Sequence, residues 1–169
     1  MNKVLFTHSY FYKLDPKQWS FKQPYPPLGT LQAASVVRDA GFAVSVFDVG
    51  LKDSPEEIKT VLQKEKPSYL VIYDDGFNYL TKMCLTVMRE AAFKMAGHAK
   101  QQDCIVIINS SDATDHYEKY FQHGVDIVVR GEGEETLKEL LFALDQKSDL
   151  STIQGLAYKN GTETIVNPS

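Results

Sequence analysis

The first residues that could do chemistry lie at the end of a short apolar run, in the stretch DIVVRGEGEETLKELLFAL. Gly131 and Gly133 alternate there with carboxylates, where a strand would give way to a helix. Many nucleotide-binding proteins hold a phosphate at such a turn, because backbone N–H groups and the helix dipole attract an anion. The side chains of Glu132, Glu134 and Glu135 would repel that anion at close range. The carboxylates instead complement the positive end of the helix, so a phosphate cradle is disfavoured and a simple helix cap with turn glycines stays open.

Two further nucleotide-type sites are disfavoured by the loops after the first and third predicted strands. A dinucleotide site requires G-x-G-x-x-G after the first strand, whereas residues 7–10 read THSY. Asp74, after the third strand, stands where a response-regulator receiver has its phosphoacceptor. A receiver also needs an acidic pair after the first strand and a lysine after the fifth, and neither loop contains them.

These loops must be positioned by strands that alternate with helices along the chain. The predicted strands are residues 3–7, 42–48, 69–73, 104–109 and 126–129. The helices are indicated by apolar residues at i, i+3, i+4 and i+7. They cover residues 30–40, a segment between the Ser54-Pro55-Glu56-Glu57 capping box and Pro67, residues 80–102 with Cys84, Val87, Met88, Ala91 and Met95 buried, a segment lined by Tyr117, Tyr120 and Phe121, and a segment lined by Leu137, Leu140, Leu141 and Leu144.

This alternation predicts an α/β fold, a flavodoxin-like (Rossmann-like) doubly wound parallel sheet with strand order 2-1-3-4-5. Ligands of such sheets bind beyond the carboxyl ends of the strands. Five loops converge there, at residues 7–29, 48–53, 74–78, 109–114 and 130–134. The first loop is over twenty residues long and contains six aromatic rings, which predicts either a packed lid over the end of the sheet or a platform that covers a ligand.

The alternation ends near residue 150. The following segment, IQGLAYKNGTETIVNP, has two short extended runs around Asn160-Gly161, a dipeptide typical of hairpin turns. We therefore expect an α/β domain over residues 1–150, and a C-terminal β-hairpin with the start of a linker to a further part of a longer protein over residues 151–169; the family resemblance given below implies that this missing part is a catalytic domain.

Composition narrows the choice of partners. The chain has 18 basic and 22 acidic side chains and no cluster of lysines and arginines that would form a phosphate-neutralising stripe, so nucleic acid is not an expected partner. No apolar run reaches the roughly 18 residues of a membrane-spanning helix, and the start lacks the layout of a signal peptide. We expect a cytoplasmic protein without a membrane partner. Cys84 and Cys104 form no C-x-x-C or Cys/His cluster, so we expect buried thiols and no metal site.

Three segments, taken in order, resemble one known family. YPPLGTLQAASVVRDAGFAVSVFD resembles the segment after the first strand in the cobalamin-binding-like domains of radical S-adenosylmethionine enzymes. SSDATDHYEKYFQHGVDIVVRGEGEETLKELL is similar to the second half of those domains, and IQGLAYKNGTETIVNP is similar to their closing segment. The most specific part is VVRGEGEETL followed by GLAY and NP, and the resemblance spans nearly the whole chain.

The resemblance implies an N-terminal domain that binds cobalamin and orients it against the enzyme's own C-terminal catalytic barrel. In that family the barrel uses S-adenosylmethionine and holds an iron–sulfur cluster on a C-x-x-x-C-x-x-C motif, which is absent from this sequence. A corrin is a large, mostly apolar macrocycle with amide side chains, so its site calls for small residues and backbone groups at the strand ends. The cofactor-binding residues that the resemblance implies are His8, Ser9, Leu28, Gly29, Asp75, Gly76, Ser110, Ser111, Thr114, Gly131, Glu132 and Gly133.

Two hypotheses of different classes follow for function. The first is the cobalamin-binding domain of a methyltransferase or related radical enzyme, with no catalytic residue and no metal ligand of its own. The second is a domain that kept the fold, lost the cofactor and serves as a scaffold or interaction surface. Retention of a corrin absorption band through gel filtration discriminates between them.

One cobalamin signature is missing. The motif D-x-H-x-x-G, whose histidine replaces the cofactor's own base on cobalt, does not occur. His8 lies at the matching place, but Phe6 stands where the aspartate would be. Members of the family commonly lack the motif, so we expect His8 to be a hydrogen-bonded histidine at the rim of the sheet and not a cobalt ligand.

Overall fold

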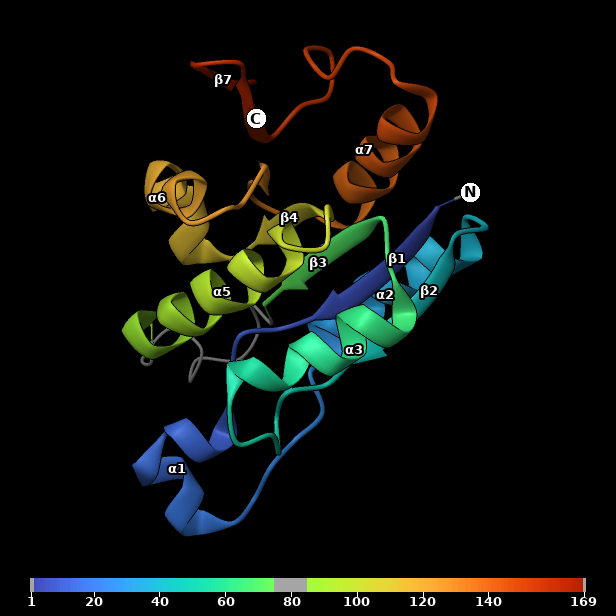
Figure 1. Ribbon diagram of the computed structural model, residues 1–169. Coiled ribbons are helices and arrows are strands. Elements are labelled where there is room, and N and C mark those ends of the chain that lie inside the picture. Colours follow the sequence, from blue (N-terminus) through green and yellow to red (C-terminus); the bar gives the residue numbers. More distant parts are fainter. Residues whose placement is uncertain (1, 75–84, 169) are drawn as a thin grey trace.

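The computed structural model describes residues 2–74 and 85–168. Its strands are β1 (Lys3–Thr7), β2 (Ala43–Phe47), β3 (Tyr69–Tyr73), β4 (Ile105–Asn109), β5 (Ile127–Val129), β6 (Leu156–Asn160) and β7 (Glu163–Val166) (Figure 1). Its helices are α1 (Pro16–Phe21), α2 (Leu28–Asp39), α3 (Ile58–Glu65), α5 (Leu85–Lys100), α6 (Ser111–Gln122) and α7 (Glu134–Gln146), with short 3-10 helices η1 (Tyr12–Leu14) and η2 (Pro55–Glu57). The five predicted strands are all present, each within one or two residues of its expected bounds.

The described strands form one sheet in the order β2-β1-β3-β4-β5-β6-β7. β1 to β5 pair in parallel, while β6 and β7 are antiparallel. The predicted α/β class and the order 2-1-3-4-5 are confirmed. Because the winding reverses between β1 and β3, the loops after these strands part at the carboxyl edge of the sheet.

The predicted C-terminal hairpin is present, and it extends the sheet beyond β5. Val129 lies opposite Leu156, and Asn160 pairs with Glu163 across the turn. Gly161 adopts a φ of +63° in that turn, a conformation that glycine reaches without steric cost. β6 and β7 therefore cover the edge that β5 would otherwise expose.

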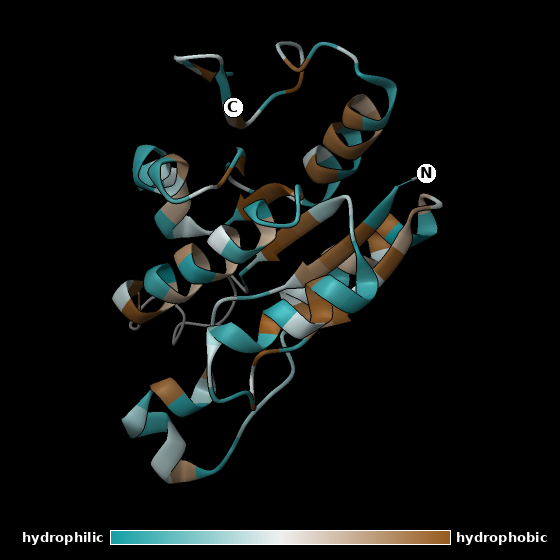
Figure 2. Ribbon diagram, in the orientation of Figure 1, coloured by the Kyte–Doolittle hydropathy of each residue, from teal (hydrophilic) through white to brown (hydrophobic). Residues whose placement is uncertain are grey.

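Helices cover both faces of the sheet, as a doubly wound fold requires (Figure 1). One core packs α3, α5 and α6 against one face, with Leu62, Met95 and Tyr120 among its members. The other core packs α2 and α7 against the opposite face, with Val37 and Leu140 among its members. Figure 2 shows the hydrophobic colour concentrated on the central strands, and β3 is buried along its whole length. Within the part of the chain that the structure describes, no helix combines the length and the apolar character needed to cross a membrane.

Local sequence signals set the ends of several helices. The predicted capping box of Ser54 and Glu57 is present before α3. Gly41 follows α2 with a φ of +100°, as expected for a C′ glycine. At the start of α6, the hydroxyl of Ser110 accepts a hydrogen bond from the backbone N–H of Ala113 at 3.0 Å. The two serine caps fix helix starts that face the carboxyl edge of the sheet, and Gly41 fixes the end of α2.

The long segment between β1 and α2 is ordered and contains η1 and α1. Tyr10 and Tyr12 are buried, and Trp19 packs edge-on against Tyr12 with ring centroids 5.7 Å apart. Phe21 and Tyr25 are exposed. The inner rings of the segment therefore pack together in a lobe beyond the carboxyl end of β1, and Figure 1 shows the backbone of this lobe in blue around the α1 label.

The predicted buried face of the long helix is wrong at one residue. Val87 is 39% exposed, whereas Met88, Ala91 and Met95 of α5 are buried. The core-facing stripe of α5 runs through those three residues, and Val87 lies to one side of it. The predicted first turn of this helix, with Cys84, lies outside the described residues.

Candidate functional site

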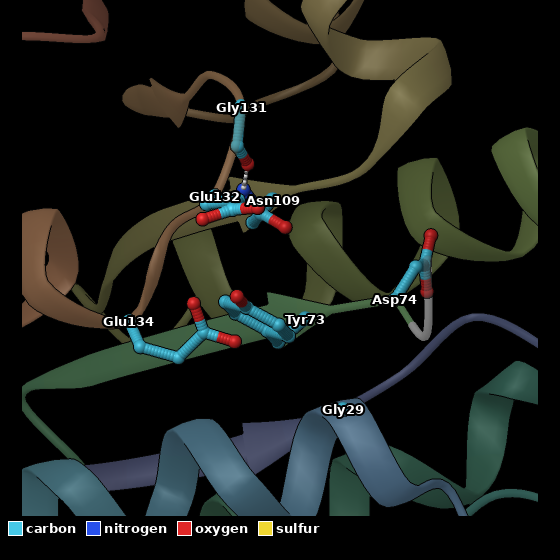
Figure 3. A pocket seen from close by; sticks show the side chains of 7 residues that line it. All are labelled: Gly29, Tyr73, Asp74, Asn109, Gly131, Glu132 and Glu134. Carbon is cyan, nitrogen blue, oxygen red and sulfur yellow. Dashed lines mark hydrogen bonds between the residues drawn. The ribbon is translucent and has the colours of Figure 1, made fainter. Parts of the chain in front are cut away.

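A cavity of about 330 Å³ lies at the carboxyl edge of the sheet. Figure 3 shows its described lining, which is Gly29, Tyr73, Asp74, Asn109, Gly131, Glu132 and Glu134. These residues come from the start of α2, the ends of β3 and β4, and the turn from β5 into α7. The cavity therefore occupies the place where doubly wound sheets bind their ligands. Three of the described lining side chains are carboxylates, and none is a lysine, arginine or histidine.

Asp74 is a buried carboxylate at the end of β3. It accepts hydrogen bonds from the backbone N–H of Ser9 at 2.7 Å and from the Ser9 hydroxyl at 2.9 Å. Burial raises the pKa of Asp74, and the hydrogen bonds from Ser9 oppose that rise. The contact ties the loop after β1 to the wall of the cavity, so the Ser9 hydroxyl proton is already engaged within the protein.

Tyr73 and Glu134 form a second polar contact in the cavity wall. Burial raises the pKa of Tyr73 above its usual value, and the negative charge of Glu134 raises that pKa further. Figure 3 shows the Glu134 side chain extended toward the Tyr73 ring. The Thr30 hydroxyl donates to the Tyr73 carbonyl at 2.6 Å. The phenol therefore stays protonated, and the start of α2 is held against the end of β3.

Asn109 organises the turn that carries the glycine and glutamate motif. Its Nδ2 donates to the carbonyls of Val129 and Gly131, each at 3.0 Å. Both N–H groups of the amide are thus used, and its oxygen remains as an acceptor. A Cβ added at Gly133 would lie 2.7 Å from Asn109 Nδ2 and 3.1 Å from Val129 Cγ1, whereas a Cβ at Gly131 would meet open space. Gly133 therefore serves internal packing, while Gly131, with a φ of +74°, exposes its backbone to the cavity.

His8 is buried at the end of β1 and is hydrogen-bonded. Its Nε2 lies 2.8 Å from Asp48 Oδ1, in the loop after β2. The hydrogen bond with His8 lowers the pKa of Asp48, and burial opposes this. Phe6 is a core residue, so the carboxylate partner comes from another strand end. The expected hydrogen bond is confirmed, while the relation of His8 to cobalt stays a prediction.

Three residues of the set that the resemblance implies, Ser110, Ser111 and Thr114, carry hydroxyls and lie at the first turn of α6. Ser110 is buried and caps the helix, and the hydroxyl of Thr114 donates to the Ser110 carbonyl at 3.0 Å. Ser111 is exposed. None of the three is among the described residues that line the cavity, so their proposed contacts to cofactor amides depend on a ligand that extends along the rim.

The remaining implied residues fall at the start of α2 and in the loop after β3. Leu28 is 65% exposed at the rim, while Gly29 is buried and lines the cavity. Asp75 and Gly76 lie outside the described residues. The cavity thus joins Gly29, Gly131 and Glu132 from the set that the resemblance implied.

Tyr73, Asp74, Asn109 and Glu134 line the cavity without being among the residues that the resemblance implied. Their signal in the sequence is positional, because three of them stand at or just after the carboxyl end of a buried strand and the fourth opens a helix. A polar residue at such a position points to the ligand edge of a parallel sheet.

A charged network holds α5 and α6 together beside this edge. Asp112 Oδ2 accepts hydrogen bonds from Arg89 Nε and from the Tyr120 hydroxyl, each at 2.7 Å. Burial alone would raise the pKa of Asp112, but the hydrogen bonds from Arg89 and Tyr120 lower it. The first turn of α6 is therefore anchored through a partly buried ion pair.

Comparison with known proteins relates this architecture to large enzymes. The chain is 29% identical over 149 residues to an anaerobic magnesium-protoporphyrin IX monomethyl ester cyclase of Synechocystis, a match that covers 85% of this chain and 28% of the cyclase. No protein-family model matches the chain.

Two solved structures share the fold over almost the entire chain. One is OxsB, a cobalamin-dependent S-adenosylmethionine radical enzyme with aqua-cobalamin and S-adenosylmethionine bound. Its TM-score is 0.73 at 18% identity, and the match covers 100% of this chain and 22% of OxsB.

The other is TsrM of Kitasatospora setae, a radical S-adenosylmethionine methyltransferase with cobalamin and a 4Fe–4S cluster bound. Its TM-score is 0.71 at 20% identity, and the match covers 99% of this chain and 29% of TsrM. The chain therefore spans less than a third of each of these proteins. Over its whole length it has the fold found within cobalamin-dependent radical S-adenosylmethionine enzymes, and the resemblance predicted from its sequence is confirmed.

Proposed function

We propose that this chain binds cobalamin at the carboxyl edge of its sheet and presents it to the catalytic domain of a radical S-adenosylmethionine enzyme. The observation that carries the proposal is the match of the whole chain to the fold of OxsB and TsrM, whose structures hold cobalamin. The similarity in sequence to the cyclase supports the same class of parent enzyme.

The residues at this edge fit a corrinoid. A corrin has an apolar, flat surface and primary amides around its periphery. Exposed Leu28 offers apolar surface at the rim, and open space beside Gly131 permits close approach to its backbone. Asn109 Oδ1 and the carboxylates of Glu132 and Glu134 offer acceptors to amide N–H groups. A volume of about 330 Å³ is at the lower end for a ligand site, so the cavity would take one part of so large a cofactor.

The chain's own residues would bind and orient the cofactor. Ser9 and Asp74 hold the loop after β1 in place, and Asn109 holds the turn after β5. Ser110 and Ser111 would offer hydroxyls along the rim. When bound, cobalamin supplies organometallic chemistry such as methyl transfer, which the protein directs by position. The catalytic partner would be the enzyme's own radical S-adenosylmethionine domain.

Retention of the cofactor tests the proposal. The purified full-length protein is loaded with hydroxocobalamin and passed through gel filtration, and the corrin absorption band is expected to elute with the protein at a stoichiometry near one. A protein that elutes without the band, while folded by circular dichroism, would favour the alternative of a scaffold domain that lost the cofactor.

A further inference from the structure

We infer that the cavity at the carboxyl edge selects corrinoids whose peripheral side chains are amides and rejects those that carry carboxylates at the same positions. The inference rests on the proposed function and adds a specificity to it. The supporting observation is which hydrogen-bonding groups of the cavity wall remain available to a ligand, and not the presence of acidic residues alone.

Among the described lining side chains, the amide donors of Asn109 are already used inside the protein. Both N–H groups of Asn109 go to the backbone carbonyls of Val129 and Gly131. The Glu134 side chain extends toward Tyr73, and its negative charge raises the pKa of the phenol (Figure 3). The described wall contains no lysine, arginine or histidine that could supply a further donor.

Most of the side-chain groups that remain in the described lining are acceptors. Asn109 keeps its amide oxygen, because the two hydrogen bonds from Nδ2 fix which end of the amide faces the turn. Glu134 lines the cavity as well, and a carboxylate has about four acceptor sites. Glu132 lines the same cavity and is exposed. A ligand group that brings its own N–H or O–H donors therefore finds several side-chain acceptors here.

Primary amides meet this requirement and carboxylates do not. An amide NH₂ gives two donors and carries no charge, whereas a carboxylate gives none and repels Glu132 and Glu134 at close range. Replacement of one amide by a carboxylate therefore exchanges a hydrogen bond to a charged acceptor for a like-charge contact. We expect binding to weaken by about tenfold or more for the position that faces the cavity.

The three monocarboxylic acids made by mild hydrolysis of cobalamin's propionamides are suitable probes. Their dissociation constants for the full-length protein are compared with that of the parent cobalamin, with the same upper cobalt ligand throughout, by equilibrium dialysis with absorbance detection. At least one isomer is expected to bind about tenfold or more weakly. That ratio should shrink in Glu134→Gln, because glutamine removes the negative charge and offers an NH₂ to the acid.

Glu135→Gln is the matched control. Glu135 is the next residue in the first turn of α7, its side chain is 72% exposed and paired with Lys138, and it does not line the cavity. It removes the same charge near the same helix end, so the discrimination ratio should stay unchanged. Thermal unfolding of both variants confirms that they are folded.

The outcomes separate the inference from the proposed function. A wild-type protein that fails to bind the parent cobalamin overturns both. Binding of the parent cobalamin with all three acids within about threefold of it overturns the inference alone. Equal relief of discrimination by Glu134→Gln and Glu135→Gln also overturns it, because general charge near α7 would then be the cause.

Discussion

Replacement of Gly133 by alanine should destabilise the fold through one identifiable contact. The added Cβ would lie 2.7 Å from Asn109 Nδ2, 3.1 Å from Asn109 Cγ and 3.1 Å from Val129 Cγ1. Overpacking of this kind costs about 1–3 kcal/mol. Displacement of the amide also weakens its hydrogen bonds to the Val129 and Gly131 carbonyls, each worth about 0.5–1.5 kcal/mol. We expect the free energy of unfolding to fall by about 2–4 kcal/mol.

Urea unfolding of a double-mutant cycle measures this contact. In an Asn109→Ala background the closest atom is gone, so the cost of Gly133→Ala should drop by about 1 kcal/mol or more. Gly131→Ala is the control, since its Cβ meets open space and its cost of about 1–2 kcal/mol comes from the left-handed φ alone. That cost should be the same with and without Asn109. If the two Gly133→Ala penalties agree within error, the packing argument is refuted.

Three further predictions concern buried polar groups. The pKa of Asp112 is lowered, so its pairing with Arg89 should stabilise the fold at pH values above the ordinary carboxyl pKa of 3.8 and lose this effect as the pH falls through the folded-state pKa. The difference in unfolding free energy between wild type and Asp112→Asn should therefore close in acid. A difference that does not depend on pH would contradict the assignment. Burial raises the pKa of Asp74, so the pH dependence should have the opposite sign. In thermal unfolding, Asp74→Asn should gain stability relative to wild type as the pH rises from 4 to 7. A relative loss of stability over that range would show that the folded protein stabilises the ionised carboxylate. His8 Nε2 is hydrogen-bonded with Asp48, so we expect that His8 does not bind cobalt. The test is electron paramagnetic resonance of the cob(II)alamin-loaded protein with the cofactor's own base displaced, where wild type and His8→Ala should give the same spectrum. A nitrogen splitting that is present in wild type and lost in His8→Ala would identify a histidine ligand.

The sequence by itself determined the architecture of this protein. Apolar runs and helical spacing located the strands and most of the helices, because these patterns reflect which face of each element is buried. The right-handed crossover rule then left few topologies, and the order 2-1-3-4-5 was among them. Caps such as Ser54 and C′ Gly41 were also predictable, since they depend on residues within one turn. Val87 was placed wrongly because spacing alone does not decide which edge of an apolar stripe meets solvent.

The tertiary structure decided which polar residues meet. The contact of Ser9 with Asp74 joins residues 65 apart in the chain, and that of His8 with Asp48 joins residues 40 apart. Such contacts depend on the register of neighbouring strands and on the path of each loop, which no local pattern encodes. The two glycines of the GEGEE motif look equivalent in the sequence. Only the packing of Asn109 across the end of β5 separates them, because it leaves no room for a side chain at Gly133 and open space at Gly131.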